Sequence, residues 1–306
     1  MYSPIAFFCF NRPFHTYQTL NALVKNKESS KSDLIVFIDG PEHPSQIELI
    51  ANVEKIILSF AKSFQNLTIN KSEINLGGAR NQSYGITQVL KKHEKIIVIE
   101  DDVLVSPSFL KYMNKSLDLY YSNKKIWHIN GFNFPINSDK EKECYFSKVM
   151  FCWGWGTWQS RWIKYKNDLL FQDPYYLKEL FTKKMIKEFN LNTNINFFWS
   201  QIQSNLKGKI SWDIFWYSYI FLNKGLCLTP YRSLTKNIGH DGSGVHCGKN
   251  SKIQKSLINM KHINKFPKNN LEDIEALKKM RKYLRETYNI RAKIFRKLKS
   301  FFPIIF

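Results

Sequence analysis

Short apolar runs alternate with stretches of helical periodicity through the first 125 residues, and this alternation constrains the fold more than any other feature. Apolar runs predict strands at residues 5–10, 34–38, 67–69 and 96–99. Apolar residues at helical spacing predict helices at residues 14–24, 46–60, 82–92 and 109–121. Strand–helix alternation of this kind is typical of an α/β fold, in which helices cover both faces of a parallel sheet.

The excess of basic residues narrows the partners that the chain can be expected to bind. Its 306 residues include 46 lysines and arginines against 25 acids, a formal net charge of +21. Such a charge favours anionic partners, namely nucleic acid, a membrane surface or phosphorylated small molecules. The basic residues are spread along the chain, so base usage in the gene is an alternative explanation for the composition.

Composition also excludes several classes of protein. With 43% hydrophobic residues the chain is not disordered, and its apolar runs are far shorter than the ~20 residues that span a bilayer. Five cysteines without a C-x-x-C pair predict reduced thiols rather than a disulfide framework or a zinc site. The first ten residues read as a strand rather than a signal peptide. We therefore expect a cytoplasmic protein.

Polar residues follow three of the predicted strands at the point where each strand ends. Asn11 and Arg12 follow the first strand, Asp39 follows the second, and three acids follow the strand at 96–99. In parallel sheets ligands bind outside the carboxyl ends of the strands. We therefore expect these side chains to face one crevice.

The three consecutive acids, Glu100, Asp101 and Asp102, are the sharpest local signal. Packed together they repel one another unless a cation neutralises them, and no lysine or arginine lies in the turn that follows. Carboxylate oxygens suit Mg²⁺ or Mn²⁺, which complete their coordination with water and substrate phosphates. The alternative is a solvated acidic turn, which the fully apolar strand before it disfavours.

The acidic turn and the residues after it resemble the metal-binding DXD segment of GT-A glycosyltransferases, most closely the inverting N-acetylglucosaminyltransferase I type. The residues that carry this resemblance are Glu100, Asp101, Asp102, Pro107, Phe109 and Tyr112. Five further stretches occur in the family's order, at residues 10–13, 37–40, 152–158, 212–213 and 230–244. Residues 75–81 look more like bacterial family-2 glycosyltransferases, and residues 165–210 have no counterpart.

The resemblance, together with the chemistry of the side chains, implies roles for individual residues. Asp102 and His246 would hold Mn²⁺ or Mg²⁺, and Asp213 would be the catalytic base that accepts the proton of the acceptor hydroxyl. Trp155 and Trp158 would stack on the acceptor sugar. Contacts to the nucleotide-sugar donor would come from Arg12, Asp39, Arg80, Glu100, Asp101, Lys236 and His240.

Each role has a structural alternative. Asp213 can cap a helix that begins with the apolar run 214–222, and tryptophans at this density are ordinary core residues. The histidines can lie incidentally in an exposed loop, and Arg80 and Lys236 are single basic residues in a basic chain.

The resemblance further implies a GT-A (Rossmann-like), mostly parallel sheet flanked by helices. Residues 1–250 would form the glycosyltransferase domain, with a nucleotide-binding half at 1–125 and an acceptor half at 126–250 that contains a helical segment at 165–210. Residues 251–306 would be a basic helical C-terminal extension. Residues 290–306 interleave basic and large apolar residues, which is typical of an amphipathic helix on an anionic membrane, although packing on the domain is the alternative.

The activity that follows is metal-dependent transfer of a sugar, with inversion, from a nucleotide diphosphate such as UDP to a glycan hydroxyl, in bacterial capsule or lipo-oligosaccharide synthesis. A lipid-linked acceptor would place the enzyme at the inner face of the cytoplasmic membrane. The alternatives are a retaining transferase or a nucleotidyltransferase on the same sheet, although residues 11–15 lack the glycine of a phosphate loop. A non-catalytic basic module that binds nucleic acid or membranes is a further alternative, but without a nucleic-acid-binding motif we expect no nucleic-acid partner.

Overall fold

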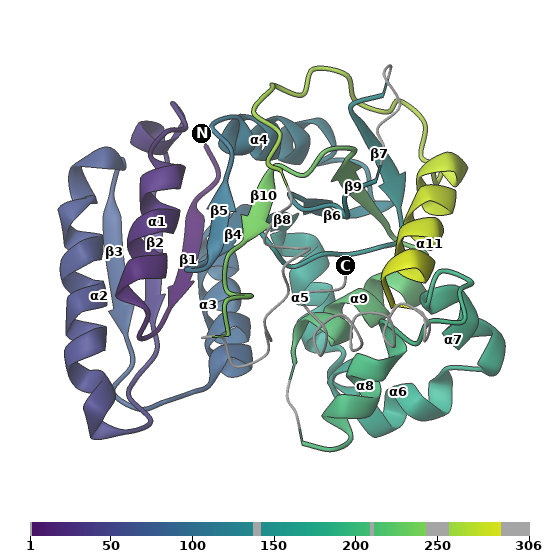
Figure 1. Ribbon diagram of the computed structural model, residues 1–306, viewed down its shortest axis with the longest axis horizontal. Helices are drawn as coiled ribbons and strands as arrows, with labels where there is room; N and C mark the ends of the chain where they lie inside the picture. Colours follow the sequence, from purple (N-terminus) through teal and green to yellow (C-terminus); the bar gives the residue numbers. More distant parts are fainter. Residues whose placement is uncertain (1, 137–141, 209–210, 243–256, 289–306) are drawn as a thin grey trace, which may run out of the picture.

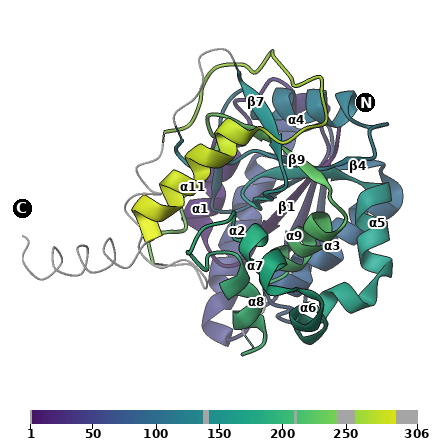
Figure 2. The same cartoon turned by 90° about the vertical axis from the view of Figure 1, so that its right-hand side faces the viewer.

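Figure 1 shows the computed structural model of the protein, which describes residues 2–136, 142–208, 211–242 and 257–288. An eight-stranded sheet in the order β3-β2-β1-β4-β8-β6-β9-β7 forms its centre. Helices cover both faces of this sheet (Figure 2), which confirms the predicted fold class, an α/β fold with a large central sheet. The strands are β1 (Ile5–Cys9), β2 (Leu34–Ile38), β3 (Leu67–Lys71), β4 (Lys95–Glu100), β6 (Ile126–Asn130), β7 (Cys144–Ser147), β8 (Trp155–Trp158) and β9 (Leu226–Pro230).

The first half of the sheet is parallel, as the alternation of strands and helices predicts. Successive side chains of a strand point to opposite faces. Ile5 and Phe7 of β1 therefore enter one core, beneath α1 (Pro13–Leu23) and α2 (Ile47–Ser59), together with α4 (Phe109–Leu119). Ala6 and Phe8 enter the opposite core, beneath α3 (Gly78–Lys92). The predicted strands and helices of this half are confirmed, with ends within a few residues of those expected.

The second half of the sheet is mixed. β8 runs antiparallel to both β4 and β6, and β7 runs antiparallel to β9, so that β6–β9 is the parallel pair of this half. The apolar pattern does not predict β7 or β8. β8 consists of two tryptophans, a glycine and a threonine, and it lies in a stretch whose glycine content is typical of a turn.

The segment predicted to be helical at 165–210 consists of short helices that share an aromatic core with the helix after them. The ring centroids of Phe189 and Tyr217 lie 4.3 Å apart, and those of Phe181 and Trp199 lie 5.0 Å apart. The same core contains Trp155 of β8 and Cys227 of β9, and it therefore joins the segment to the second half of the sheet. The helices are α5 (Gln159–Asn167), α6 (Pro174–Leu180), α7 (Lys183–Phe189), α8 (Trp199–Asn205) and α9 (Asp213–Leu222).

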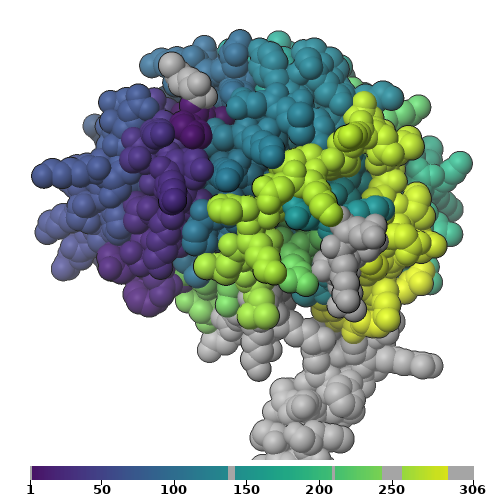
Figure 3. All heavy atoms as spheres, turned by 90° about the horizontal axis from the view of Figure 1, so that it is seen from above, coloured from purple at the N-terminus to yellow at the C-terminus, as the bar shows by residue number. Residues whose placement is uncertain are grey.

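Residues 257–288 lie over the outer side of the second half and end in α11 (Ile274–Tyr288), the helix predicted after residue 271 (Figure 3). The amide of Asp273 donates a hydrogen bond of 2.8 Å to the carbonyl of Phe146 on the edge strand β7. Met280 and Leu284 of α11 are fully buried in the core beneath the sheet. Residues 290–306, the predicted membrane-binding segment, lie outside the described residues.

Within the described ranges, no helix has both the length and the apolar character that crossing a membrane would require.

Candidate active site

The acidic turn is buried at the edge of the sheet. β4 ends at Glu100, and Asp101 and Asp102 are 3% and 6% exposed. The main chain of Asp101 is held on both sides: its amide donates to the carbonyl of Phe8 (2.9 Å), and its carbonyl accepts from the Thr19 hydroxyl (2.7 Å). The turn is therefore not a solvated one, because its second and third carboxylates are withdrawn from water.

Arg12, from the turn after β1, is the cation that faces these acids. Its Nε donates to Oδ2 of Asp101 at 3.3 Å, and its Nη2 pairs with the other oxygen of Asp101 and with Oδ2 of Asp102 at 3.0 Å. The sequence shows no cation in the turn that follows the acids, and the structure supplies one from the end of β1, the strand that pairs with β4. Arg12 was expected to contact the donor; here it binds the acidic turn.

A loop from the second half closes on Asp102. β5 (Val103–Val105), directly after the acids, pairs antiparallel with β10 (Thr235–Asn237). The side chain of Asn237 donates to Oδ1 of Asp102 at 3.3 Å. A Cβ atom on Gly239 would overlap Oδ2 of Asp102, so any larger residue at this position would displace the carboxylate. The loop thereby brings residues 237–239 onto the acidic turn.

The basic residues predicted in this loop lie close to the same place. Lys236 is half-buried on β10 and pairs in register with Leu104 of β5. His240 is 9% exposed, and its ring centroid lies 5.4 Å from that of Trp153. The neighbouring Asp241 pairs with Nε2 of His15 at 3.1 Å. His246, the other predicted metal ligand, lies outside the described residues.

A chain of hydrogen bonds joins Glu100 to the start of α9. Gln82 of α3 donates from Nε2 to Oε2 of Glu100 at 2.9 Å, and its Oε1 accepts from the indole Nε1 of Trp212 at 3.1 Å. Asp213 is the first residue of α9, and the hydroxyl of Ser211 donates to its Oδ1. Asp213 does not cap the helix, since the N-cap residue is Trp212 and no side-chain capping bond is present. The acidic turn and Asp213 thus belong to one connected cluster.

Burial and the charges of neighbouring carboxylates raise the pKa values of two acids in this cluster, Glu100 and Asp101. The pKa of Glu100 is raised to about 8, first by burial and then by the charges of Asp102, Asp101 and Asp213. The pKa of Asp101 is raised to about 6 by burial, against the opposing effect of Arg12. Burial and the charges of Asp213 and Glu100 also raise the pKa of the Cys152 thiol well above its ordinary value. Asp213 is therefore within electrostatic reach of Glu100, and a bound cation would stabilise both.

The carboxylates fit a divalent cation in kind but do not form a complete site. No group of three His, Cys, Asp or Glu side chains that could hold a metal ion occurs in the part of the chain that the structure describes. Mg²⁺ needs only one or two carboxylates when substrate phosphates and water complete its shell. Asp102 can supply such an oxygen, although its Oδ2 is in contact with Arg12.

Asp39 and Arg80 lie at the same edge but are not part of the cluster. Oδ1 of Asp39 accepts hydrogen bonds from the amides of Gly40 (2.9 Å) and Leu76 (2.8 Å), which ties the end of β2 to the loop before α3. Arg80 is exposed on the first turn of α3. Among the described residues, no hydrogen bond or ion pair joins either side chain to the acidic turn.

The predicted roles of Trp155 and Trp158 in acceptor stacking need correction, because both side chains are 0% exposed. Trp158 points into the core beneath α4, where its Nε1 donates to the carbonyl of Leu117 at 2.9 Å. Trp155 points to the opposite face and stacks on His128 with ring centroids 4.8 Å apart. Neither ring is accessible to a sugar. Trp153, which is partly exposed beside His240, is the tryptophan of this segment nearest the site.

Sequence reasoning does not single out Gln82, Cys152 or Asn237. One signal was present for Gln82: it follows Asn81 on the buried side of an otherwise amphipathic helix, where two polar residues are unusual. Cys152 and Asn237 lie inside stretches matched to the family, but their contacts depend on the tertiary structure.

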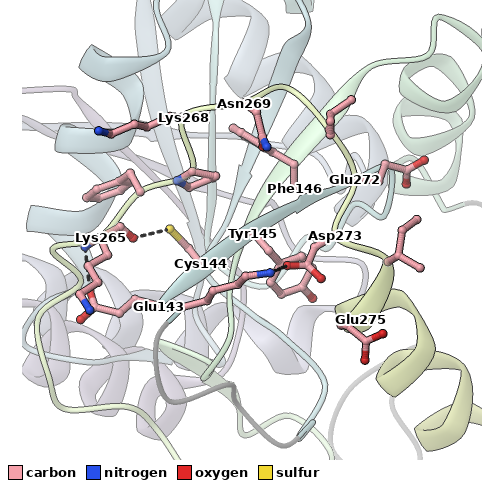
Figure 4. Close-up of a pocket in the computed structure, with 15 residues that line it drawn as sticks. Glu143, Cys144, Tyr145, Phe146, Lys265, Lys268, Asn269, Glu272, Asp273 and Glu275 are labelled. Atoms are coloured by element: carbon pink, nitrogen blue, oxygen red, sulfur yellow. Dashed lines mark hydrogen bonds and ion pairs between the residues drawn. The ribbon is translucent and has the colours of Figure 1, made fainter.

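Two cavities lie away from this cluster. One of about 580 Å³ is lined by β7 and residues 265–275, where Cys144 Sγ donates to the carbonyl of Lys265 and Lys142 pairs with Asp273 at 2.8 Å (Figure 4). A second, of about 290 Å³, lies between α7, α9 and α11. None of the candidate catalytic or donor-binding residues lines either cavity.

No protein-family model and no curated protein matches the chain. Among solved structures, a crystal structure of S. aureus TarS matches 40% of this chain and 20% of its own, with 17% identity and a TM-score of 0.32. S. aureus TarS 1-349 matches 76% of this chain and 59% of its own, with 13% identity and a TM-score of 0.44. An active-site mutant of LgtC matches 71% of this chain and 70% of its own, with 10% identity and a TM-score of 0.38. The chain spans less than two thirds of the length of both TarS structures.

Proposed function

We propose that this chain is a GT-A glycosyltransferase that moves a sugar, with inversion, from a nucleotide diphosphate to a hydroxyl of a glycan acceptor. The observation that carries the proposal is the hydrogen-bonded connection Glu100–Gln82–Trp212, which brings the acidic turn of the first half beside Asp213 of the second. Such a displacement needs two parts: charged side chains that bind the nucleotide-sugar donor, and a carboxylate that accepts the proton of the acceptor hydroxyl. Both would lie within this one cluster.

The first half would bind the donor. Nη1 of Arg12 has no acceptor among the described residues, while the other side of the guanidinium is fixed by Asp101. It can therefore donate to a diphosphate oxygen without losing its orientation. Asp39 at the end of β2, with Arg80, Lys236 and His240 around the same edge, would complete the contacts to the nucleotide and its phosphates.

Asp213 would act as the general base. Ser211 donates to Oδ1, and Oδ2 would accept the proton of the acceptor hydroxyl. The acceptor oxygen would bond to the anomeric carbon while the bond from that carbon to the diphosphate oxygen breaks on the opposite side. Mg²⁺ or Mn²⁺, when bound with the diphosphate at Asp102, would neutralise the charge that develops on the leaving group.

The acceptor and the location of the enzyme remain part of the proposal. A lipid-linked glycan, met at the inner face of the cytoplasmic membrane in the synthesis of a bacterial surface polysaccharide, suits the basic character of residues 290–306. Vesicle flotation of the full chain and of a chain ending at residue 289 tests the membrane contact. Equal binding of both to anionic vesicles would contradict it.

A thermal-shift screen of nucleotide sugars, with Mn²⁺ and with EDTA, tests the activity. A ligand that binds the native state raises its melting temperature, so a uridine diphosphate sugar should stabilise the protein and a nucleoside without phosphates should not. NMR of the product from the active donor then reports the configuration at the anomeric carbon. Retained configuration would contradict inversion, and the absence of stabilisation by every nucleotide sugar would contradict the proposed function.

A further inference from the structure

The geometry points to Arg12 as an internal counter-ion that competes with a divalent cation for Asp102, so that the acidic turn takes up the cation only together with the diphosphate. This inference rests on the proposed function. It assigns to Arg12 a role in the order of binding, in addition to the contact with the donor that the resemblance implies.

The guanidinium is held as a fork between two carboxylates. Asp101 takes Nε and Nη2, and Nη2 also reaches Oδ2 of Asp102 at 3.0 Å. The side chain of Arg12 is 20% exposed, and those of Asp101 and Asp102 are 4% and 9% exposed. Ion pairs withdrawn from water in this way are screened weakly, so Arg12 neutralises a large part of the negative field of the turn.

Arg12 and a divalent cation cannot both occupy Oδ2 of Asp102. On its other side that oxygen lies against Gly239, and the second carboxylate oxygen accepts from Asn237. A Mg²⁺ or Mn²⁺ ion binds carboxylate oxygen at about 2.1 Å, which would place its double charge directly beside the guanidinium. One of the two cations must therefore leave Asp102.

The diphosphate gives Arg12 a second place to bind. Nη1 lies beside residue 239 and has no acceptor in the described part of the chain. When Nη2 releases Asp102, Asp101 still orients the guanidinium through Nε. Nη1 and Nη2 could then both donate to phosphate oxygens, and Asp102 would be left to hold the cation. Without the diphosphate, Arg12 would lose its contact with Asp102 and gain no other anion in its place.

Binding of free Mn²⁺ in the absence of nucleotide, followed by electron paramagnetic resonance, tests the competition. We expect Arg12→Met to bind Mn²⁺ at least about tenfold more tightly than the unchanged protein, since it removes a charge in contact with the carboxylate. Arg285→Met, which removes an exposed arginine of α11 far from the turn, should leave Mn²⁺ affinity unchanged. Equal affinity of the Arg12→Met variant and the unchanged protein would overturn the inference.

Loss of Arg12 leaves buried acids unpaired, so Arg12→Lys is the second variant. An ammonium keeps the charge but cannot bridge two carboxylates as a fork, so we expect a smaller gain in Mn²⁺ affinity and a folded protein. If Arg12→Met is insoluble, the lysine variant decides, and no gain would overturn the inference.

The same titration in the presence of UDP separates this inference from the proposed function. UDP should raise the Mn²⁺ affinity of the unchanged protein more than that of Arg12→Met, because only the former must displace an arginine. An equal increase in both would contradict the competition and leave the proposed function standing. Failure of the unchanged protein to bind UDP under any condition would contradict the proposed function, whatever Arg12→Met does with free Mn²⁺.

Discussion

The two halves of the sheet each hold an arginine withdrawn from water, and they use it differently. Arg161 in the second half is 3% exposed and donates to the carbonyls of Ile126, Tyr121 and Asn123, while its guanidinium lies 4.5 Å from the ring centroid of Trp158. All its acceptors are neutral, and burial lowers its pKa. Arg12 faces two carboxylates; burial lowers its pKa, but the charges of Asp101 and Asp102 outweigh that effect and raise it.

This difference separates a structural arginine from a functional one. The donors of Arg161 bind three carbonyls of one turn, residues 121–126, so the residue ties α5 to the turn that leads into β6. Arg12 has a donor nitrogen, Nη1, without an acceptor in the described part of the chain, and it lies between the carboxylates of Asp101 and Asp102. Burial by itself therefore does not identify a site; charged partners and unused donors do.

The largest expected effect is that of Asp213→Asn, at the charged edge. The amide cannot accept the proton of the acceptor hydroxyl, so we expect the rate of sugar transfer to fall about 10²–10⁴-fold. Affinity for the nucleotide sugar, measured by calorimetry, should stay within a factor of about two, because the side chain does not contact the donor in the proposed arrangement. Normal turnover in the variant would exclude Asp213 as the base.

Arg161→Met, in the second half, should lower the stability of the protein without changing its binding of the donor. The three carbonyls lose a charged donor, and we expect the free energy of unfolding in urea to decrease by about 3 kcal/mol. Nucleotide affinity of the remaining folded protein should not change. If Arg161→Met were as stable as the unchanged protein but bound the nucleotide sugar more weakly, Arg161 would be a functional residue rather than a structural one.

Gln82→Leu removes the two hydrogen bonds that connect Glu100 of the first half with Trp212 of the second. Glu100 and the indole of Trp212 each lose a hydrogen bond, which should cost about 1–3 kcal/mol in unfolding free energy. Because Asp213 is positioned through Trp212, we expect kcat to fall about tenfold, with a smaller change in KM. Gln172→Leu, in the second half, is the matched control for kcat. An unchanged kcat in Gln82→Leu would mean that the connection has no role in catalysis.

The smallest effect concerns the pH dependence of stability. Burial lowers the pKa of His128 to about 3. In its neutral form the ring donates from Nε2 to the carbonyl of Phe151 (3.1 Å) and accepts at Nδ1 from the indole of Trp216 (3.2 Å). Below about pH 6.5 the unfolded chain binds a proton that the folded chain does not, so stability decreases as pH falls.

Urea unfolding at pH 7.0 and pH 5.5 measures this term. The unchanged protein should lose about 1 kcal/mol more than His128→Gln over this interval, with a limiting slope of about 1.4 kcal/mol per pH unit. Glu100 acts in the opposite direction, because its raised pKa favours the folded state at low pH and that contribution is lost as pH rises towards 8. If both proteins lost the same free energy of unfolding between pH 7.0 and pH 5.5, His128 would not be a cause of the loss of stability in acid.

The first half was predictable because its signals are local. β2 occupies the residues expected from a single apolar run, and the convergence of Arg12 with the acids follows from parallel strands ending at one edge. The ion pair itself was not predictable, since the partners are 89 residues apart and a search of neighbouring positions misses Arg12.

The second half depends on tertiary contacts that leave little trace in the sequence. β5 and β10 have three residues each and exist as strands only because they pair with each other. Trp155 and Trp158 look like a binding surface when read in sequence, yet β8 places them in two different cores. Short strands and aromatic clusters have no periodicity from which to infer which side chains reach the site.

The burial of α11 also has a consequence for the order of folding. Ala276, Met280 and Leu284 complete the hydrophobic face that Phe134 and Tyr217 share on the second half of the sheet. During synthesis the parallel half can close on itself early, since its strands and helices are neighbours along the chain. The other half cannot complete its core until residues 276–284 have been synthesised, because three side chains of that core come from them.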